Sequence, residues 1–149
     1  MATSGDIGRF TARIIRSIAV AKTSDLVFGR IVKPALGSGT VTIDPATGAR
    51  TVTGGQGLDT PSPSRAAFNV TGEGGQAFSI AVTPSFQMTG PQAALTVTTA
   101  TSAAGSPVLS QSLGMQGAYA FGVGGAFTLG ATTPSGDYSG SLSVTVSYN

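Results

Sequence analysis

The sequence contains no cysteine and no histidine. Without cysteine there is no disulfide and no thiolate ligand or nucleophile, so cysteine usage leaves the redox compartment undecided. Without histidine, the Ser-His-Asp triad, the Cys-His dyad and nearly every zinc site are excluded. We therefore expect a protein that is not an enzyme, with no cofactor and no catalytic or metal-binding residues.

Charged residues are also scarce, at 9% of the chain, and they are unevenly placed. Six of the eight basic residues lie in the first 33 positions, and beyond Arg65 the only charges are Glu73 and Asp137. A net charge of +2 neutralises few phosphates, and no cluster of basic residues is interleaved with aromatics. We therefore do not expect a nucleic-acid partner.

Long apolar runs are missing as well. No stretch approaches the ~20 residues that a membrane span requires. The run "IIRSIAVA" is too short for a secretory signal and is interrupted by Arg16. If the protein is exported, we expect this chain to be the mature form, without its signal peptide and with Met1 added.

What the sequence does contain is typical of short strands joined by turns. Hydrophobic residues make up 40% of the 149 residues, and 22 glycines and 8 prolines separate short runs in which apolar and polar residues alternate. A chain of this length is one domain by the usual expectation, large enough to bury roughly two-thirds of its unfolded surface. The predicted fold is an all-β, immunoglobulin-like antiparallel β-sandwich of roughly eight to ten strands.

Individual segments sharpen this prediction. "GTVTID" and "RTVTGG" flank the turn "PATG" and predict a hairpin, whereas the prolines of "GLDTPSPS" predict a loop. "AAFNVTGEGGQAFSIAV" predicts two strands joined by a glycine-rich turn. Gly29, in the middle of "DLVFGRIV", predicts a bulge or a close approach of another backbone.

Motifs that suggest chemistry are better explained as structure. "GEGG" and "GVGGAFTLG" could cradle a phosphate only if a helix followed, so we interpret them as turn or bulge glycines. The sequon at Asn69 lies inside a predicted strand. Asp44 and Asp59 sit beside prolines or glycines, where aspartate commonly initiates turns. Glu73 and Asp137 lack the surrounding acidic run of a calcium loop.

The segment "RFTARIIRSIAVAK" fits two structures. As a strand beginning at Phe10 it places one apolar set on one face, with Arg16 the only misfit: Phe10, Ala12, Ile14, Ile18 and Val20. As a helix over residues 7–21 it would oppose an apolar side to a basic side, a pattern suited to a membrane surface. Its β-branched content and the all-β remainder favour the strand.

The last residues form the cleanest alternating pattern of the chain. Leu142, Val144, Val146 and Tyr148 alternate with serines and a threonine, which predicts a half-buried strand that runs almost to the carboxyl terminus. Residues 142–149 contain no charge, proline or glycine that would blunt a sheet edge. The strand is therefore either central in its own sheet or an edge that pairs with a partner.

Two family resemblances follow from these residues. The C-terminus resembles that of pilin subunits assembled by the chaperone–usher pathway, with a penultimate tyrosine (Tyr148), alternating apolar residues before it, and a glycine (Gly136) fourteen places from the end. Nearly the whole chain resembles an uncharacterised family of short secreted bacterial β-sandwich proteins, a domain of unknown function. The segments similar to that family, in order, are "SIAVAKTSDLVFGRIV", "GTVTIDPATGARTVTGG", "AAFNVTGEGGQAFSIAV" and "GDYSGSLSVTVSYN".

The pilin resemblance implies donor-strand exchange, in which the N-terminal extension of one subunit completes the sandwich of the next. It implies an extension over residues 1–17 and one β-sandwich over residues 18–149. The expected C-terminal edge strand comprises Gly136, Leu142, Val144, Val146 and Tyr148. The expected donor residues are Phe10, Ala12 and Ile14, together with Ile18 and Val20, which can instead begin the subunit's own first strand. The chain lacks the cysteine pair of many pilins, so its sandwich would be held by packing alone.

The function expected from this resemblance is a secreted or cell-surface structural subunit. It would be exported through the periplasm and assembled into filaments of identical subunits, with a periplasmic chaperone and an outer-membrane usher as possible further partners. Two other functions stay open: a self-contained secreted β-sandwich that binds a glycan or surface component, and a capsid-type structural protein. An exposed cluster formed by Tyr119, Phe121 and Tyr138 would favour glycan binding.

Overall fold

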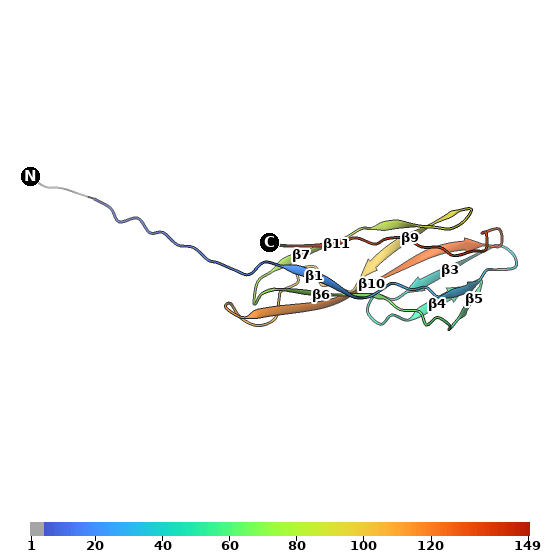
Figure 1. Cartoon of the computed structure of the whole chain (residues 1–149), viewed down its shortest axis with the longest axis horizontal. Helices are drawn as coiled ribbons and strands as arrows, with labels where there is room; N and C mark the ends of the chain where they lie inside the picture. Colours follow the sequence, from blue (N-terminus) through green and yellow to red (C-terminus); the bar gives the residue numbers. More distant parts are fainter. Residues whose placement is uncertain (1–4) are drawn as a thin grey trace, which may run out of the picture.

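The structure is a computed structural model that describes residues 5–149, and in these residues it contains strands and no helix. Figure 1 shows an elongated β domain from which the N-terminal segment extends as a single length of chain. The strands are β1 (Ala19–Ser24), β2 (Arg30–Val32), β3 (Ser38–Ile43), β4 (Arg50–Thr53), β5 (Gln56–Leu58), β6 (Ala66–Glu73), β7 (Phe78–Val82), β8 (Ser85–Thr89), β9 (Ala94–Thr101), β10 (Gln116–Gly130) and β11 (Val144–Tyr148).

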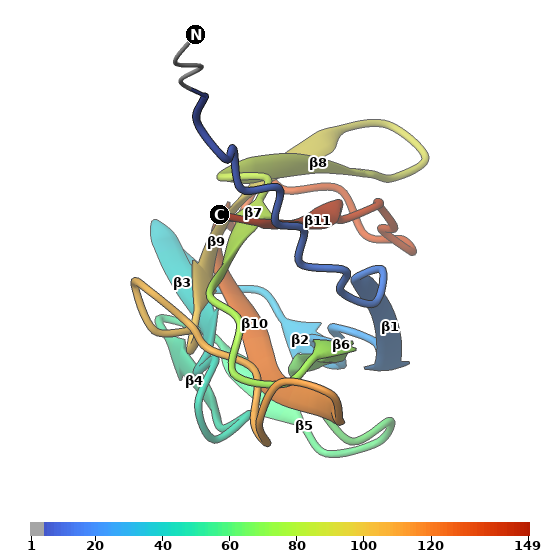
Figure 2. The same cartoon turned by 90° about the vertical axis from the view of Figure 1, so that its left-hand side faces the viewer.

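All strand pairs are antiparallel, and they form one large sheet and two small ones. The large sheet has the order β1-β6-β10-β3-β4, with β9 paired to β10 and β8 paired to β9. The small sheets are β11-β7 and β2-β5. Viewed from the end, the large sheet curls, so that its strand β8 lies on the same side of the domain as β7 and β11 (Figure 2). The predicted all-β, sandwich-like antiparallel fold is therefore confirmed, with eleven strands in the described residues.

The long strand β10 makes the large sheet curl, because it changes partner along its length. Val123 pairs with both β6 and β9, and Gly125 pairs with both β3 and β9, so β6 and β3 follow one another along the same edge of β10. A side chain at Gly124 would place its Cβ 2.0 Å from the carbonyl oxygen of Ile43. The "GVGG" glycines thus lie inside a strand rather than in the turn or bulge that the sequence suggested, because they admit β3 at close range.

Other local predictions are confirmed. β3 and β4 form the predicted hairpin, and the Asp44 carboxylate accepts hydrogen bonds from the backbone N–H groups of Ala46 and Thr47 at 2.7 and 3.1 Å in its turn. These bonds hold the pKa of Asp44 below its usual value. A Cβ at Gly29, where φ is +80°, would lie 3.0 Å from the backbone carbonyl oxygen of Pro61, so this glycine permits the close backbone approach that was predicted.

The core has two parts. The first lies beneath β1, β7 and β11 and comprises Ala66, Phe68, Val70, Phe78, Leu109, Phe121 and Val123. The second lies toward the other end of the domain and comprises Phe28, Val41, Ile43, Met88, Val97, Phe127 and Leu129. The first part is covered by the C-terminal strand, whereas several partly buried side chains around the second, including Leu26, Phe86 and Tyr138, line an open surface.

The N-terminal segment differs from the sequence-based expectation. A strand was predicted from Phe10, yet β1 begins at Ala19, and residues 5–18 belong to neither a strand nor a helix. The physical reason is the absence of a neighbour: a strand requires a partner for its backbone, and no described segment of this chain lies beside residues 5–14 (Figure 1). The alternative helix over residues 7–21 does not form either.

Candidate functional site

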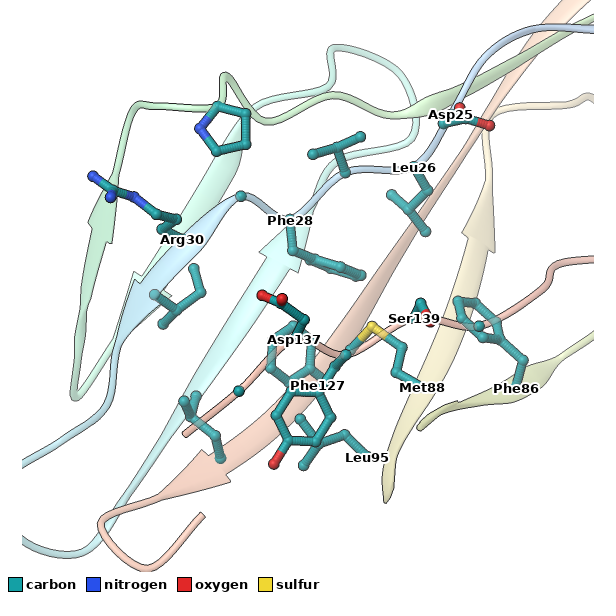
Figure 3. Close-up of a pocket in the computed structure, with 18 of the residues that line it drawn as sticks. Asp25, Leu26, Phe28, Arg30, Phe86, Met88, Leu95, Phe127, Asp137 and Ser139 are labelled. Carbon is teal, nitrogen blue, oxygen red and sulfur yellow. The ribbon is translucent and has the colours of Figure 1, made fainter. Parts of the chain in front are cut away.

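An elongated apolar groove opens over the second part of the core. It lies between two chain segments, residues 25–33 and residues 133–142, which we call its walls, and its volume is about 1270 Å³. Side chains from β8, β9, β10 and the first wall form its floor (Figure 3): Leu26, Phe28, Phe86, Met88, Leu95 and Phe127. The groove is therefore an interruption in the covering of the core rather than a polar catalytic cleft.

Each wall is hydrogen-bonded to a neighbouring segment of the chain. In the first wall, Val27 exchanges two backbone hydrogen bonds of 2.9 Å with Ser64, and β2 pairs with β5. In the second wall, Ser139 exchanges bonds of 2.7 and 3.1 Å with Thr89. Among residues 5–149 no backbone–backbone hydrogen bond joins the two walls, so they do not pair with each other across the groove.

The C-terminal residues identified from the sequence continue the second wall. Leu142, Val144, Val146 and Tyr148 pack against the first part of the core, as their alternation predicted. β11 pairs with β7 alone, so it is the edge of a two-stranded sheet and not a central strand. Gly136 has a φ of +153° and lies against Pro91.

The N-terminal segment before Arg16 presents its apolar side chains to solvent. We call residues 5–15 the tail. Ile7 is 96% exposed, Phe10 98% and Ile14 90%, and Ala12 is exposed as well. Isolated exposed apolar residues are ordinary, but large ones repeated along an extended segment mark a surface that binds something.

Ile18 and Val20 behave differently from the rest of the expected donor residues. Both are partly buried and pack against the first part of their own core. They belong to the domain's own β1 region, which is the alternative that the sequence had left open for them. The segment that leaves the domain is accordingly limited to Phe10, Ala12, Ile14 and their neighbours in the tail.

Where the tail meets the domain, three residues far apart in the sequence form what we call the latch: Arg16, Glu73 and Tyr148. Arg16 Nη1 donates to Glu73 Oε2 at 2.8 Å, and the Arg16 backbone N–H donates to Glu73 Oε1 at 3.2 Å. The Tyr148 hydroxyl donates to the Arg16 carbonyl oxygen at 2.6 Å and accepts from the Glu73 N–H at 2.8 Å. The latch fixes the point at which the tail leaves.

The Glu73 side chain is only 5% exposed, yet its environment favours the ionised form. Burial alone would raise the pKa of Glu73, but hydrogen bonds from the Gly114 and Arg16 N–H groups and the Arg16 charge outweigh burial and hold the pKa below its usual value. Glu73 was not predicted from the sequence to be a functional residue. The one available signal was Arg16, the misfit on an otherwise apolar face.

Tail and groove lie toward opposite ends of the molecule. The tail leaves from the end at which β1 begins and β11 finishes (Figure 1). The groove lies toward the end that carries β3, β4 and β5, because Ile31 and Leu58 line it. The tail therefore extends away from the groove of its own chain.

The described residues lack three features that are typical of other classes of site. No three His, Cys, Asp or Glu side chains in residues 5–149 gather into a potential metal site. None of the chain from residue 5 onward forms a helix with the length and apolar character needed to cross a membrane. Tyr119, Phe121 and Tyr138 form no exposed cluster, because Phe121 is buried and Tyr138 lies in the groove.

Comparison with protein families gives one match, and it covers most of the domain. The model of the family described as "Domain of unknown function (DUF4402)" matches residues 18–148. Comparison with curated proteins and with solved structures finds no match to this chain. The chain therefore belongs to the DUF4402 family.

Proposed function

We propose that this DUF4402 chain is a pilin-like structural subunit that forms filaments by donating its tail to the groove of an identical subunit. One observation carries the proposal: an extended tail with exposed apolar side chains and an open apolar groove occur in the same chain, at opposite ends. Such a pair of complementary surfaces makes head-to-tail contacts, which generate open rows of subunits.

The extended length of the tail matches that of the first wall of the groove. Nine residues of the first wall, 25–33, span about 30 Å at the rise of an extended strand. The apolar part of the tail, residues 7–15, also has nine residues and the same extended length. Because the two walls do not pair with each other, a tail laid along the groove could add a strand between them through main-chain hydrogen bonds.

Burial of the tail supplies a driving force. With Phe10, Ala12 and Ile14 on one face, a strand can direct all three toward the groove floor while Thr11 and Arg13 face outward. Full burial of a Phe or Ile side chain is worth roughly 1.5–3 kcal/mol, against which the cost of ordering the tail must be set. Main-chain pairing along the strand adds to this and slows dissociation.

The same surfaces imply the proposed location and the further partners. An unfilled groove and a free strand edge are aggregation hazards, so a subunit of this kind needs protection before it is assembled. A periplasmic chaperone that occupies the groove, followed by an outer-membrane usher, would provide it. We therefore propose a surface filament that is exported through the periplasm.

The proposal is tested by comparing the full chain with a chain that lacks residues 1–15 but keeps Arg16. Size-exclusion chromatography and negative-stain electron microscopy should give filaments or long-lived oligomers from the full chain and monomers from the shortened one. Phe10→Asp in the full chain should also abolish assembly. Thr11→Asp, which places the same charge on the opposite face of the tail, should leave assembly intact.

Monomers from the full chain at all concentrations would contradict the proposal. Oligomers that persist without the tail would contradict it as well, because another surface would then hold the subunits together. Either result would favour a self-contained β-sandwich whose groove binds a different ligand.

A further inference from the structure

Charged residues border the groove at defined positions. The charged side chains that line it are Lys22, Asp25, Arg30, Lys33 and Asp137. Lys22 pairs with Asp25, and Lys33 Nζ donates to the Thr133 carbonyl oxygen at 2.9 Å. In the described chain Asp137 has no ion-pair partner, although Glu73, Asp59 and Asp25 each have one.

The tail carries two arginines, which are opposite in charge to the two aspartates of the groove lining, Asp25 and Asp137. Arg9 and Arg13 are exposed, and they share the face opposite Phe10, Ala12 and Ile14. When that apolar face meets the groove floor, both guanidinium groups point toward the rim. The two arginines are four residues apart, about 13 Å along an extended strand.

The direction in which a tail enters the groove follows from the fold. The first wall runs away from the tail end of the domain, and the second wall runs back toward it and continues through β11 to Tyr148 in the latch. In a row of copies that all point the same way, the tail of the next copy enters at the far end, beside Lys33 and Thr133. It then runs inward with decreasing residue number, antiparallel to the second wall.

In this direction each tail arginine lies near one aspartate of the groove. In Figure 3, Asp25 lies near one end of the groove and Asp137 lies nearer to Arg30, toward the entry. Arg13 of the incoming tail is closer to the entry and Arg9 lies deeper. Arg13 therefore falls in the region of Asp137, and Arg9 in the region of Asp25.

We propose that Asp137 and Asp25 on the rim pair with Arg13 and Arg9 of a second copy's tail and thereby set the register of the inserted strand. The inference rests on the proposed function. Apolar contacts alone discriminate poorly between registers two residues apart, because such a slip keeps the same face of the tail toward the floor. Charges fixed at two points along the rim do discriminate, because a slip separates both pairs.

The test is a charge exchange in the full chain, with filament growth followed by light scattering. Arg13→Asp and Asp137→Arg, each alone, should slow initial growth roughly tenfold at low salt, since rim charges act mainly on association. The double variant R13D/D137R, which restores the pair with its signs exchanged, should return to within roughly twofold of the unmodified chain. Near 1 M salt, where the screening length is about 3 Å, the four proteins should converge.

A matched control separates pairing from net charge. The double variant Thr51→Asp/Ala100→Asp makes the same change in formal charge as Arg13→Asp, because each substitution adds one negative charge at an exposed position outside the groove lining. It should leave growth nearly unchanged. Circular dichroism should confirm that each variant is folded, as expected for substitutions at exposed positions.

The outcomes distinguish the two proposals. If the unmodified chain assembles and Phe10→Asp blocks assembly, but the single charge reversals grow normally or the double variant fails to recover, the ion pairs are wrong and strand donation stands. Equal slowing by Thr51→Asp/Ala100→Asp also overturns the ion pairs. An unmodified chain that never assembles overturns strand donation and the ion pairs together.

Discussion

At the scale of single residues, the latch joins the two ends of the chain. Tyr148 is one residue from the C-terminus, and its hydroxyl contacts the backbone at Arg16, 132 positions earlier, and at Glu73, 75 positions earlier. Gly72 makes room for this hydroxyl, since a Cβ there would lie 2.5 Å from it. Two small changes should therefore disturb the latch: removal of the Tyr148 hydroxyl oxygen, and addition of a Cβ carbon at Gly72.

Removal of the hydroxyl by Tyr148→Phe should destabilise the domain. The Glu73 N–H loses its acceptor in a part-buried site, which typically costs about 1–3 kcal/mol. Urea unfolding of the variant and the unmodified chain measures the difference. Ser147→Ala, at an exposed neighbouring position, is the control and should change stability little; an equal loss in both variants would mean that the hydroxyl is not responsible.

Gly72→Ala should destabilise the domain through crowding, by about 1–3 kcal/mol, because the added methyl group meets both Tyr148 and Leu109 Cδ1, the latter at 2.9 Å. Gly105→Ala has no atom within 4 Å of the new Cβ and should be close to neutral. Thermal unfolding of the two variants side by side checks this. If Gly72→Ala is tolerated as well as Gly105→Ala, the packing of Tyr148 against β6 is looser than described.

The ionised form of Glu73 should make stability depend on pH. Its pKa lies below 4.5 in the folded chain and near 4.5 in the unfolded chain, so its contribution is complete above about pH 5 and is lost as the pH falls through the folded value. The unfolding temperature should therefore decline more steeply below about pH 5 in the unmodified chain than in Glu73→Gln. Parallel curves for the two proteins would show that Glu73 does not contribute this pH dependence.

At the scale of elements, the tail and β1 are adjacent in sequence but differ in environment. Residues 19–24 pair with β6, whereas residues 5–14 have no neighbour along the chain's own surface. Backbone that is neither paired nor packed is open to proteases.

Trypsin should therefore cut the monomeric chain rapidly after Arg9 and Arg13 and slowly after Arg16, whose side chain is held by Glu73 and the Gly114 carbonyl. In assembled filaments all three sites should be protected. Mass spectrometry of timed digests identifies the cuts. Rapid cleavage after Arg13 within intact filaments would show that the tail is not inserted.

The sequence predicted elements whose signals are local. The alternation in residues 142–148, the hairpin around "PATG" and the close approach at Gly29 depend on neighbouring residues, and the structure confirms them. The resemblance to a domain of unknown function, noted over nearly the whole chain, agrees with the match of the DUF4402 model to residues 18–148. The strand expected from Phe10 does not form within the single chain, whose β1 begins at Ala19, because periodicity does not reveal whether a partner strand exists.

The candidate site was only partly predictable for the same reason. Apolar residues of the tail could be identified from alternation, but the groove combines segments more than 100 positions apart, residues 25–33 and 133–142. Glu73 is brought to Arg16 across 57 positions. Neither association leaves a pattern in a single sequence, apart from the misplaced charge of Arg16.

At the scale of the whole molecule, the second part of the core remains partly uncovered along the groove. A tail that fills the groove would bind the folded state only, so occupancy should raise stability by mass action. Filaments should consequently unfold at a clearly higher temperature than the chain that lacks residues 1–15. Differential scanning calorimetry at equal protein concentration measures this, and coincident transitions would argue against insertion.

The placement of tail and groove at opposite ends of the domain has one more consequence. A row of such subunits is polar: one terminus of the row offers a vacant groove, and the other offers a dangling tail. Each terminus would then be capped by a different molecule, the first by an isolated peptide of residues 5–15 and the second by a domain without its own tail. The concentrations of these two capping molecules would then set the filament length, independently of the strength of the contacts between subunits.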